Sequence, residues 1–222
     1  GAFLFSRGFI KTGLGKRIAY NLIAAFGSSS LRLAYALALS DLILAPATPS
    51  NTARVGGVIM PITTSLAKAF GSEPQDGPRK IGSFLMQSIY QVNTITSAMF
   101  QTSMAGNTLV AALALQSFGI GITWGDWAMA AIVPGVIALI IMPYFIYKVY
   151  PPEIKDAREA QQMIKEELKG LGKMSFQEWV MLGVFILALV LWATSQFTKI
   201  DATTVAFLGI SILLATSVLV WD

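Results

Sequence analysis

Residues 33–67 read LAYALALSDLILAPATPSNTARVGGVIMPITTSLA, two apolar arms separated by a cluster of helix-breaking and helix-capping residues at 46–52. Each arm has about 15 residues, whereas an α-helix needs about 20 apolar residues to cross a bilayer. The basic residues Arg32 and Lys68 flank the two arms. The pattern predicts a re-entrant helical hairpin over residues 33–70, with both outer ends in the cytoplasm and the tip at membrane depth.

The composition of the whole chain also indicates a membrane protein. Of the 222 residues, 55% are apolar and 13% are charged, whereas soluble domains carry about 25% charged residues. The sequence contains no histidine and no cysteine, which excludes Ser-His-Asp and Cys-His nucleophiles, imidazole- or thiolate-ligated metals and disulfides. The net charge of +4 comes mainly from basic residues at the ends of apolar runs, which is typical of membrane proteins and argues against a nucleic-acid partner.

Four further stretches are predicted membrane helices. Three contain no charged residue and are long enough to span: 127–147, 179–198 and 202–221. The fourth, 81–120, is too long for one straight crossing and is interrupted by Gly106-Asn107, so we expect a broken transmembrane helix with a short second part from Leu109 to Phe118. The chain has no initiator methionine and ends directly after an apolar run, so we expect it to be a fragment of a larger protein.

Charged residues set the expected topology. The connector 148–178 holds six basic and six acidic residues, and its lysines and arginines place it in the cytoplasm. Residues 1–32 hold five basic residues and no acidic one, so we expect an interfacial region on the same side, with a helix near residues 13–26. Ser175 and Glu178 have the spacing of a capping box, which predicts the start of the next helix.

The hairpin tip has the form of a transporter binding site. Ser50, Asn51 and Thr52 are good N-cap residues, so the second arm is expected to begin there. The free N–H groups and positive end of that helix favour a carboxylate or a phosphate. The side-chain oxygens of the same residues could instead ligate Na⁺.

The broken helix supplies complementary groups. Gly106-Asn107 offers unwound backbone carbonyls for a cation, with the hydroxyls of Thr102 and Ser103 close in sequence. The candidate substrate-binding residues are Ser50, Asn51, Thr52, Arg54, Thr102, Ser103 and Asn107, and the candidates for a sodium site are Ser50, Asn51 and Gly106.

Arg54 lies two residues beyond the tip, within apolar sequence. An intramembrane cation is costly unless it meets an anion or a water-filled cavity, which favours a role for Arg54 in binding the anion. The alternative is that Arg54 pairs with Asp41 or extends its charged end to the membrane surface.

Other interpretations remain open for the polar residues. Uncharged polar side chains are frequent between Gln87 and Thr108, and they either line a transport path or bond neighbouring helices. A membrane enzyme with Asp41 and Asp126 as paired carboxylates is disfavoured, because the predicted topology puts them on opposite sides. A third possibility is a membrane scaffold that transports nothing and whose polar residues serve helix packing alone.

Several motifs resemble those of the divalent anion:sodium symporter (DASS) family. They are Leu44-Ala-Pro-Ala-Thr-Pro-Ser-Asn-Thr-Ala-Arg-Val-Gly-Gly57, Thr12-Gly-Leu-Gly-Lys-Arg-Ile-Ala19, Thr102-Ser-Met-Ala-Gly-Asn107, Ile132-Val-Pro-Gly135, Tyr150-Pro-Pro-Glu-Ile-Lys155 and Ile200-Asp-Ala-Thr-Thr-Val205. The likeness is closer to the dicarboxylate-exchanging branch, which includes plastid 2-oxoglutarate/malate translocators and bacterial citrate/succinate antiporters.

The resemblance implies an all-α polytopic membrane protein that works as a homodimeric, elevator-type secondary transporter. It implies two inverted repeats with one re-entrant hairpin each, the second repeat starting near residue 179. Substrates would be small carboxylate anions of the malate, succinate, 2-oxoglutarate and citrate class, moved across a bacterial inner membrane or a plastid inner envelope. Residues 50–52 match the first Ser-Asn-Thr motif of the family, which contacts the substrate carboxylate and, in symporters, sodium; Gly106 and Asn107 match the loop that faces it.

Two departures from the family pattern bear on sodium. Thr108 follows Asn107 where members often have proline, and Pro46 stands where sodium-coupled members commonly have a serine. Proline offers no side-chain oxygen to a cation, whereas Arg54 offers a fixed positive charge that could take over part of the role of sodium. We therefore expect dicarboxylate exchange without sodium or another cofactor, with sodium-coupled symport as the alternative.

Overall fold

The computed structural model describes residues 2–219 of the chain, and no β-sheet is formed within that range. The helices are, in chain order, α1 (Ala2–Thr12), α2 (Leu14–Phe26), α3 (Ser30–Leu44), the 3₁₀ turn η1 (Ala45–Ala47), α4 (Asn51–Arg54), the π-helical stretch η2 (Val55–Ile59), α5 (Met60–Ala69), α6 (Gly82–Met99), α7 (Ala105–Phe118), α8 (Trp124–Val149), α9 (Arg158–Gly170), α10 (Phe176–Ala193), α11 (Ser195–Thr198) and α12 (Ala202–Ala215). The predicted all-α fold class is confirmed.

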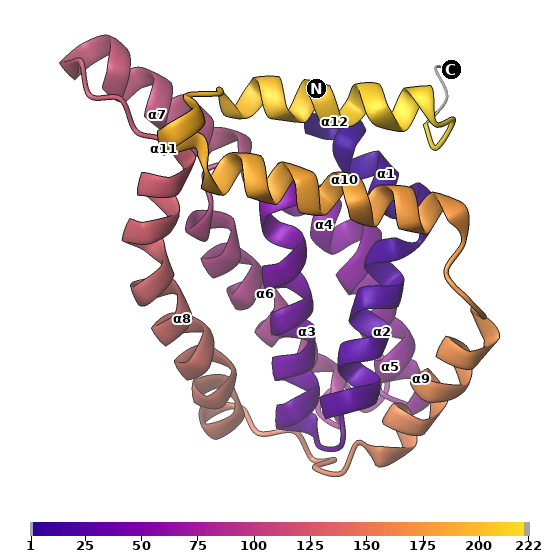
Figure 1. Ribbon diagram of the computed structural model, residues 1–222. Helices are drawn as coiled ribbons and strands as arrows, with labels where there is room; N and C mark the ends of the chain where they lie inside the picture. Colours follow the sequence, from indigo (N-terminus) through magenta and orange to yellow (C-terminus); the bar gives the residue numbers. More distant parts are fainter. Residues whose placement is uncertain (1, 220–222) are drawn as a thin grey trace.

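The segments from α3 to α5 form a helical hairpin. The side chain of Ser29 accepts a hydrogen bond from the backbone N–H of Arg32 and starts α3. The chain turns back between η1 and α4, where Pro49 lacks an N–H group and favours an extended conformation at Thr48. The outer ends of α3 and α5 lie at the lower end of the bundle in Figure 1, and the tip lies at the upper end. The position of this hairpin in a membrane stays a prediction.

The broken helix consists of α6 and α7, with the break at residues 100–104. The predicted position of the break, at Gly106-Asn107, is wrong, because both residues lie in the first turn of α7. The side-chain Nδ2 of Asn107 donates to the carbonyls of Ser97 (2.7 Å) and Phe100 (2.9 Å). Asn107 therefore bonds carbonyl groups at the end of α6 and just after it. The break itself comes before Asn107 in the sequence.

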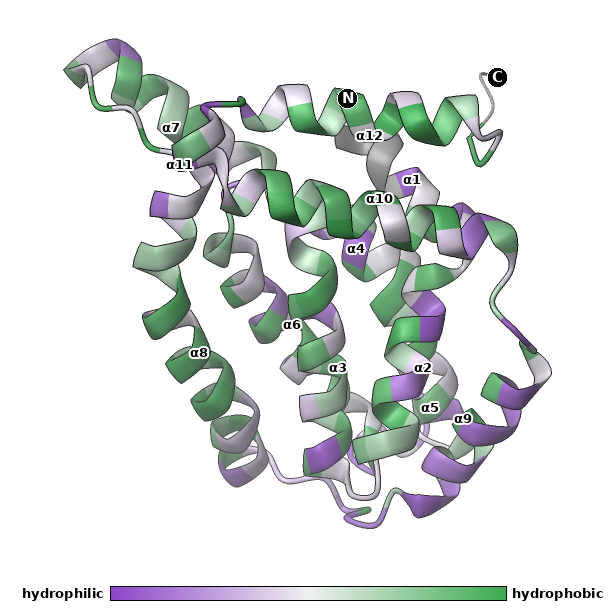
Figure 2. Cartoon of the chain, viewed as in Figure 1, coloured by the Kyte–Doolittle hydropathy of each residue, from purple (hydrophilic) through white to green (hydrophobic). Residues whose placement is uncertain are grey.

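Three segments of the described chain are long and apolar enough to cross a membrane: Ser30–Ala47, α8 and α10. The apolar helix α12 is shorter. Figure 2 shows hydrophobic residues along α8, α10 and α12, and hydrophilic residues over much of α9. The outward side chains of α8 are apolar and exposed, as on a helix that faces lipid or another part of a protein.

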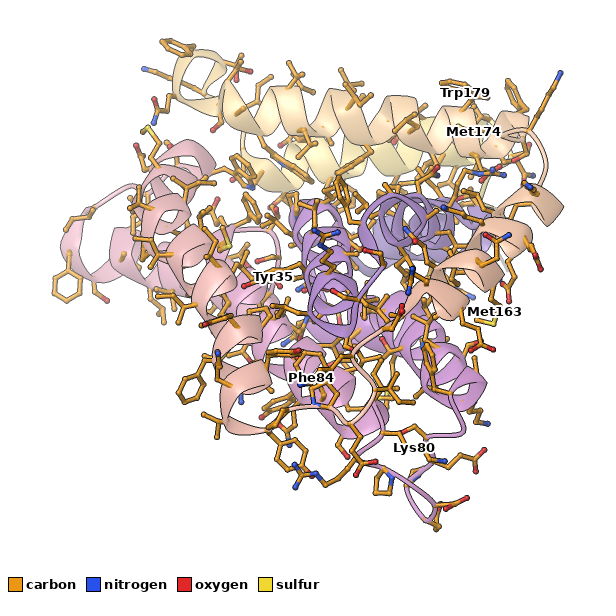
Figure 3. The ribbon with its side chains drawn as sticks, turned by 90° about the horizontal axis from the view of Figure 1, so that it is seen from below. Tyr35, Lys80, Phe84, Met163, Met174 and Trp179 are labelled. Carbon is orange, nitrogen blue, oxygen red and sulfur yellow. The ribbon has the colours of Figure 1, made fainter. Side chains whose placement is uncertain are left out.

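Helices α3, α6 and α8 pack side by side. The hydroxyl of Tyr35 on α3 donates to the carbonyl of Ile140 on α8, at 2.5 Å. The ring of Phe84 on α6 meets the ring of Tyr147 on α8 edge-on, with 5.7 Å between the centroids. Figure 3, a view from the lower end, labels Tyr35 and Phe84 in this part of the bundle. These contacts hold α8 against α3, the first arm of the hairpin, and against α6, the first part of the broken helix.

The charged connector folds back onto α2. Its helix α9 packs on α2 through the buried side chains of Ala160 and Ile164. The capping box predicted at Ser175 and Glu178 is confirmed and begins α10. Glu178 also accepts from Nε of Arg17 on α2, at 2.6 Å.

Helices α10 and α12 lie side by side and run across the upper end of the bundle (Figure 1). Helix α10 contacts η1 directly, so it covers part of the hairpin tip. Whether 179–198 and 202–221 cross a membrane stays a prediction. In the second of these segments α12 ends at Ala215, and residues 220–221 lie outside the described residues.

Candidate functional site

The hairpin tip begins a new helix, as the sequence predicts. The hydroxyl of Ser50 accepts from the N–H of Ala53 (3.2 Å), and the side-chain oxygen of Asn51 accepts from the N–H of Thr52 (2.9 Å). Thr52 is exposed and Asn51 is half-buried. Within the described residues, the side-chain NH₂ of Asn51, its backbone N–H and the hydroxyl of Thr52 have no hydrogen-bond partner in the protein. The hydroxyl of Ser50 accepts one bond and keeps its own hydrogen free, so the tip can offer these three groups and that hydrogen to a ligand.

The break of the second helix lies directly against the tip. The hydroxyl of Thr102 donates to the carbonyl of Pro46 (2.6 Å) and accepts from the indole N–H of Trp124 (2.9 Å). The hydroxyl of Ser103 bonds to carbonyls at the end of α6, at Ser97 (2.6 Å) and Phe100 (2.7 Å). The side chains of Thr102 and Ser103 therefore hold the loop in place, and both hydroxyl hydrogens are used within the protein.

Trp124 of α8 and Trp192 of α10 form a column of stacked rings with Phe100 of the break. Phe100 stacks on Trp124 with 5.6 Å between centroids, and Trp124 stacks on Trp192 of α10 with 6.1 Å between centroids. Because Trp124 also bonds Thr102, the column ties the loop to the helix that crosses the end of the bundle.

Arg54 joins the tip to the break from inside the protein. Its side chain is fully buried and all five of its N–H donors have partners. Nε donates to Oδ1 of Asp41 (2.8 Å). Nη1 donates to the carbonyls of Thr48 (3.1 Å) and Ser103 (3.2 Å), and Nη2 donates to the hydroxyls of Thr96 (3.2 Å) and Ser97 (3.1 Å).

Asp41 completes this network from the first arm of the hairpin. Its side chain is 2% exposed. Its Oδ2 accepts from the hydroxyl of Thr96 and, at 3.4 Å, from the amide of Asn93. The alternative considered from the sequence, a pair between Arg54 and Asp41, is thus present in the structure.

The predicted site residues fall into two groups. Asn51 and Thr52 keep open polar groups, and Gly106 is half-exposed at the start of α7. The side chains of the others are bonded within the protein: Ser50, Arg54, Thr102, Ser103 and Asn107. The structure brings all of these residues to one end of the bundle, at the contact between tip and break.

Other polar residues singled out from the sequence lie elsewhere. Gln87 and Gln91 line a cavity of about 1100 Å³ between α5, α6 and α8. Asp126 belongs to the exposed capping box of α8, where it bonds Thr123 and Gln196. Asp41 and Asp126 thus take part in separate networks and share no hydrogen bond.

Sequence reasoning missed the roles of Thr96 and Trp124. Asp41 carried a signal, because it is the lone acidic residue between Arg32 and Glu73, and an isolated charge in apolar sequence needs a partner. Nothing in the local sequence of Thr96 or Trp124 indicates which distant group each one bonds.

Comparison with known proteins gives a consistent family match over the full chain. The model of the family described as the sodium:sulfate symporter transmembrane region matches residues 1–222. The chloroplast dicarboxylate transporter 1 of Spinacia oleracea is 48% identical over 221 residues, which are 99% of this chain and 39% of that protein. The inner membrane protein YbhI of Escherichia coli is 47% identical, over all of this chain and 46% of that protein.

A third relative is the citrate/succinate antiporter of Escherichia coli, which is 39% identical over 222 residues, all of this chain and 45% of that protein. The chain thus spans less than half the length of the curated relatives it matches. The matched residues, which include the site described above, therefore make up only part of each relative.

Proposed function

The chain belongs to the family of the sodium:sulfate symporter transmembrane region, and from that premise we propose that the complete protein is a secondary transporter that exchanges dicarboxylates across a membrane. The family consists of membrane transporters, so the membrane-enzyme alternative is set aside. Relatives named as a dicarboxylate transporter and a citrate/succinate antiporter support small dicarboxylates and tricarboxylates as the cargo.

One observation carries the proposal: the tip and the break form one bonded unit with open polar groups at the start of the second hairpin arm. The N–H and amide of Asn51 and the hydroxyl of Thr52 are donors suited to a carboxylate oxygen. The remaining predicted residues, Ser50 and 102–107, hold this edge of the site in shape. A preorganised set of donors binds an anion without a further cost of ordering.

Exchange rather than sodium symport is the mode we propose. Nη1 of Arg54 donates to one carbonyl of the tip, at Thr48, and one of the break, at Ser103. Backbone carbonyls from interrupted helices are also ligands that coupling sodium ions use. A guanidinium that is covalently part of the chain occupies this place permanently, so no dissociating cation is needed to join the two segments. Sodium symport, with Ser50, Asn51 and Gly106 as ligands, is the competing proposal.

The elevator movement and the homodimer are further parts of the proposal. The network around Arg54 unites the hairpin with α6, so these elements would move with the cargo as one body. The relatives are more than twice as long as this chain, and the rest of the complete protein would supply the other side of the site and the contacts between protomers.

The test uses the complete protein in liposomes preloaded with malate or succinate. We expect labelled dicarboxylate to enter at the same rate with or without a sodium gradient, and to stop when the internal anion is omitted. Uptake that requires sodium and needs no internal anion would favour symport. Folded protein that takes up no dicarboxylate under either condition would refute transport of this class and leave the scaffold interpretation.

A pair of variants tests the site itself. Asn51→Ala combined with Thr52→Val removes the two open side-chain donors and leaves the backbone N–H of residue 51 in place. We expect the KM for dicarboxylate to rise by about tenfold or more, because each hydrogen bond to a charged group contributes about 1.5–3 kcal/mol. The matched control is Thr94→Ala on α6, whose exposed hydroxyl bonds only the carbonyl of Tyr90 in its own helix. Equal effects of the two changes would place the anion elsewhere.

A further inference from the structure

The charge of Arg54 is balanced inside the protein. Arg54 and Asp41 are both buried, at 1% and 2% exposure, and Nε lies 2.8 Å from Oδ1. The two residues stand on opposite arms of the hairpin, α4 and α3. Because the two side chains carry opposite charges, the pair adds no net charge between the tip and the break.

The same bond sets the orientation of the guanidinium. The five donors of arginine lie in one plane, so fixing Nε on Asp41 aims the other two nitrogens. Nη1 then meets the carbonyls of Thr48 and Ser103, and Nη2 meets Thr96 and Ser97. No donor of Arg54 remains for a ligand while Asp41 holds it.

Loss of the negative charge of Asp41 would upset this charge balance. The guanidinium would keep its charge in a buried place without a counter-ion, which is strongly unfavourable. A transported carboxylate bound at Asn51 and Thr52, which precede Arg54 by three and two residues, would then be attracted by the unbalanced charge. Cargo attracted in this way binds more tightly and leaves more slowly.

We propose that Asp41 is a positioning residue for transport: it aims Arg54 at the two interrupted segments and cancels its charge, so that the arginine shapes the site without holding the cargo. This inference rests on the proposed function and assigns Asp41 a part in it. Asp41 itself touches no cargo.

The first test is Asp41→Asn in the complete protein, assayed by exchange in liposomes. The amide oxygen of asparagine can still accept from Nε, so this change removes the counter-charge and keeps the orientation. We expect the KM for dicarboxylate to fall by up to about tenfold, because the unbalanced positive charge attracts the anion. We expect the maximal exchange rate to fall as well, since tighter binding of the cargo before translocation does not speed translocation. A role in folding alone would lower the amount of active protein and leave the KM unchanged.

The second test is Asp41→Asn combined with Arg54→Gln, which removes both charges and avoids an unpaired one. We expect the fall in KM caused by Asp41→Asn to disappear, because the unbalanced charge that causes it is gone. A KM that stays as low in the double variant as in Asp41→Asn would show that Arg54 does not cause the tighter binding, and would overturn the proposal. If Asp41→Asn alone does not assemble, assembly of the double variant would support the pairing, and a double variant that also fails to assemble would count against it.

Two controls separate the possible failures. Ser40→Ala changes a buried hydroxyl beside Asp41 that bonds only the carbonyl of Ala36 in its own helix, and we expect an unchanged KM. Unfolding midpoints of Asp41→Asn, of Arg54→Gln and of the double variant measure the coupling of Asp41 and Arg54 without any transport. If the parent exchanges no dicarboxylate, the proposed function fails. If instead the change in midpoint of the double variant equals the sum of the changes in the two single variants, the two residues are not coupled, and the positioning of Arg54 by Asp41 is refuted.

Discussion

Two arginine–carboxylate pairs of this chain have the same chemistry and different surroundings. Arg54 and Asp41 join the two arms of the hairpin, with side-chain exposures of 0% and 2%. Arg17 and Glu178 join α2 to the start of α10 with exposures of 12% and 7%. Both contacts use Nε, at 2.8 Å and 2.6 Å.

The two pairs differ in what the remaining donors reach. The other nitrogens of Arg54 bond four groups in three segments of the site. Those of Arg17 bond the loop before α10, at the carbonyls of Gly172 (2.9 Å) and Leu171 (3.4 Å), and Glu178 again. Arg54 thus organises the interior of the candidate site, whereas Arg17 fastens the connector at a surface that water can reach. We expect this difference to rank the effects of breaking each pair.

Breaking the buried pair should have the largest effect. For Arg54→Met we expect the free energy of unfolding to fall by about 3–5 kcal/mol, because Asp41 then stays buried without a counter-charge. Denaturant unfolding of the purified protein in detergent measures this change. Arg54→Met together with Asp41→Leu should recover most of the loss, because an apolar pair leaves no buried charge. A loss below about 1 kcal/mol for Arg54→Met, typical of exposed pairs, would contradict the contrast between the two regions.

Breaking the connector pair should have an intermediate effect. Glu178 both accepts from Arg17 and closes the capping box by accepting from the N–H of Ser175 (2.7 Å). For Glu178→Ala we expect a loss of about 1–2 kcal/mol, the range of a lost helix cap. The matched control is Glu166→Ala on the exposed face of α9, which should change little. Because water reaches Arg17, added salt should shrink the loss at Glu178 and leave that at Arg54 unchanged.

The sequence predicted those features of the fold and site that depend on neighbouring residues. The N-cap at Ser50 and the capping box at Ser175 are such features, because the bonded groups lie within three residues of each other. The position of the break was predicted wrongly, because Asn107 was interpreted as the interruption although it caps carbonyls up to ten residues earlier.

The partners of Arg54 could not be derived in the same way. Its donors reach from Asp41 to Ser103, and the bond to Ser103 spans 49 residues. Local patterns show that a charge in apolar sequence needs a partner, but the choice between an internal carboxylate and a ligand depends on packing among α3, α4 and α6. Trp124 is a similar case, since its indole bonds a loop 22 residues away.

The exposed pair of Asp156 and Arg158 should give the smallest effect and completes the series. Hydrogen bonds from the side chain and backbone of Arg158 lower the pKa of Asp156 to about 2, although the two side chains are 55% and 77% exposed. By its sign, a lowered pKa favours the fold at neutral pH, and this contribution is lost as the pH falls toward 2; because both side chains are exposed, water screens the pair and keeps the contribution too small to resolve. For Asp156→Asn at neutral pH we therefore expect no resolvable change in the free energy of unfolding. Carboxyl NMR should show the pKa of Asp156 rising part of the way to its ordinary value in Arg158→Gln, because the backbone N–H of residue 158 still donates to Asp156. A clear loss of stability at neutral pH in Asp156→Asn would instead mean that burial does not set the order of the three pairs.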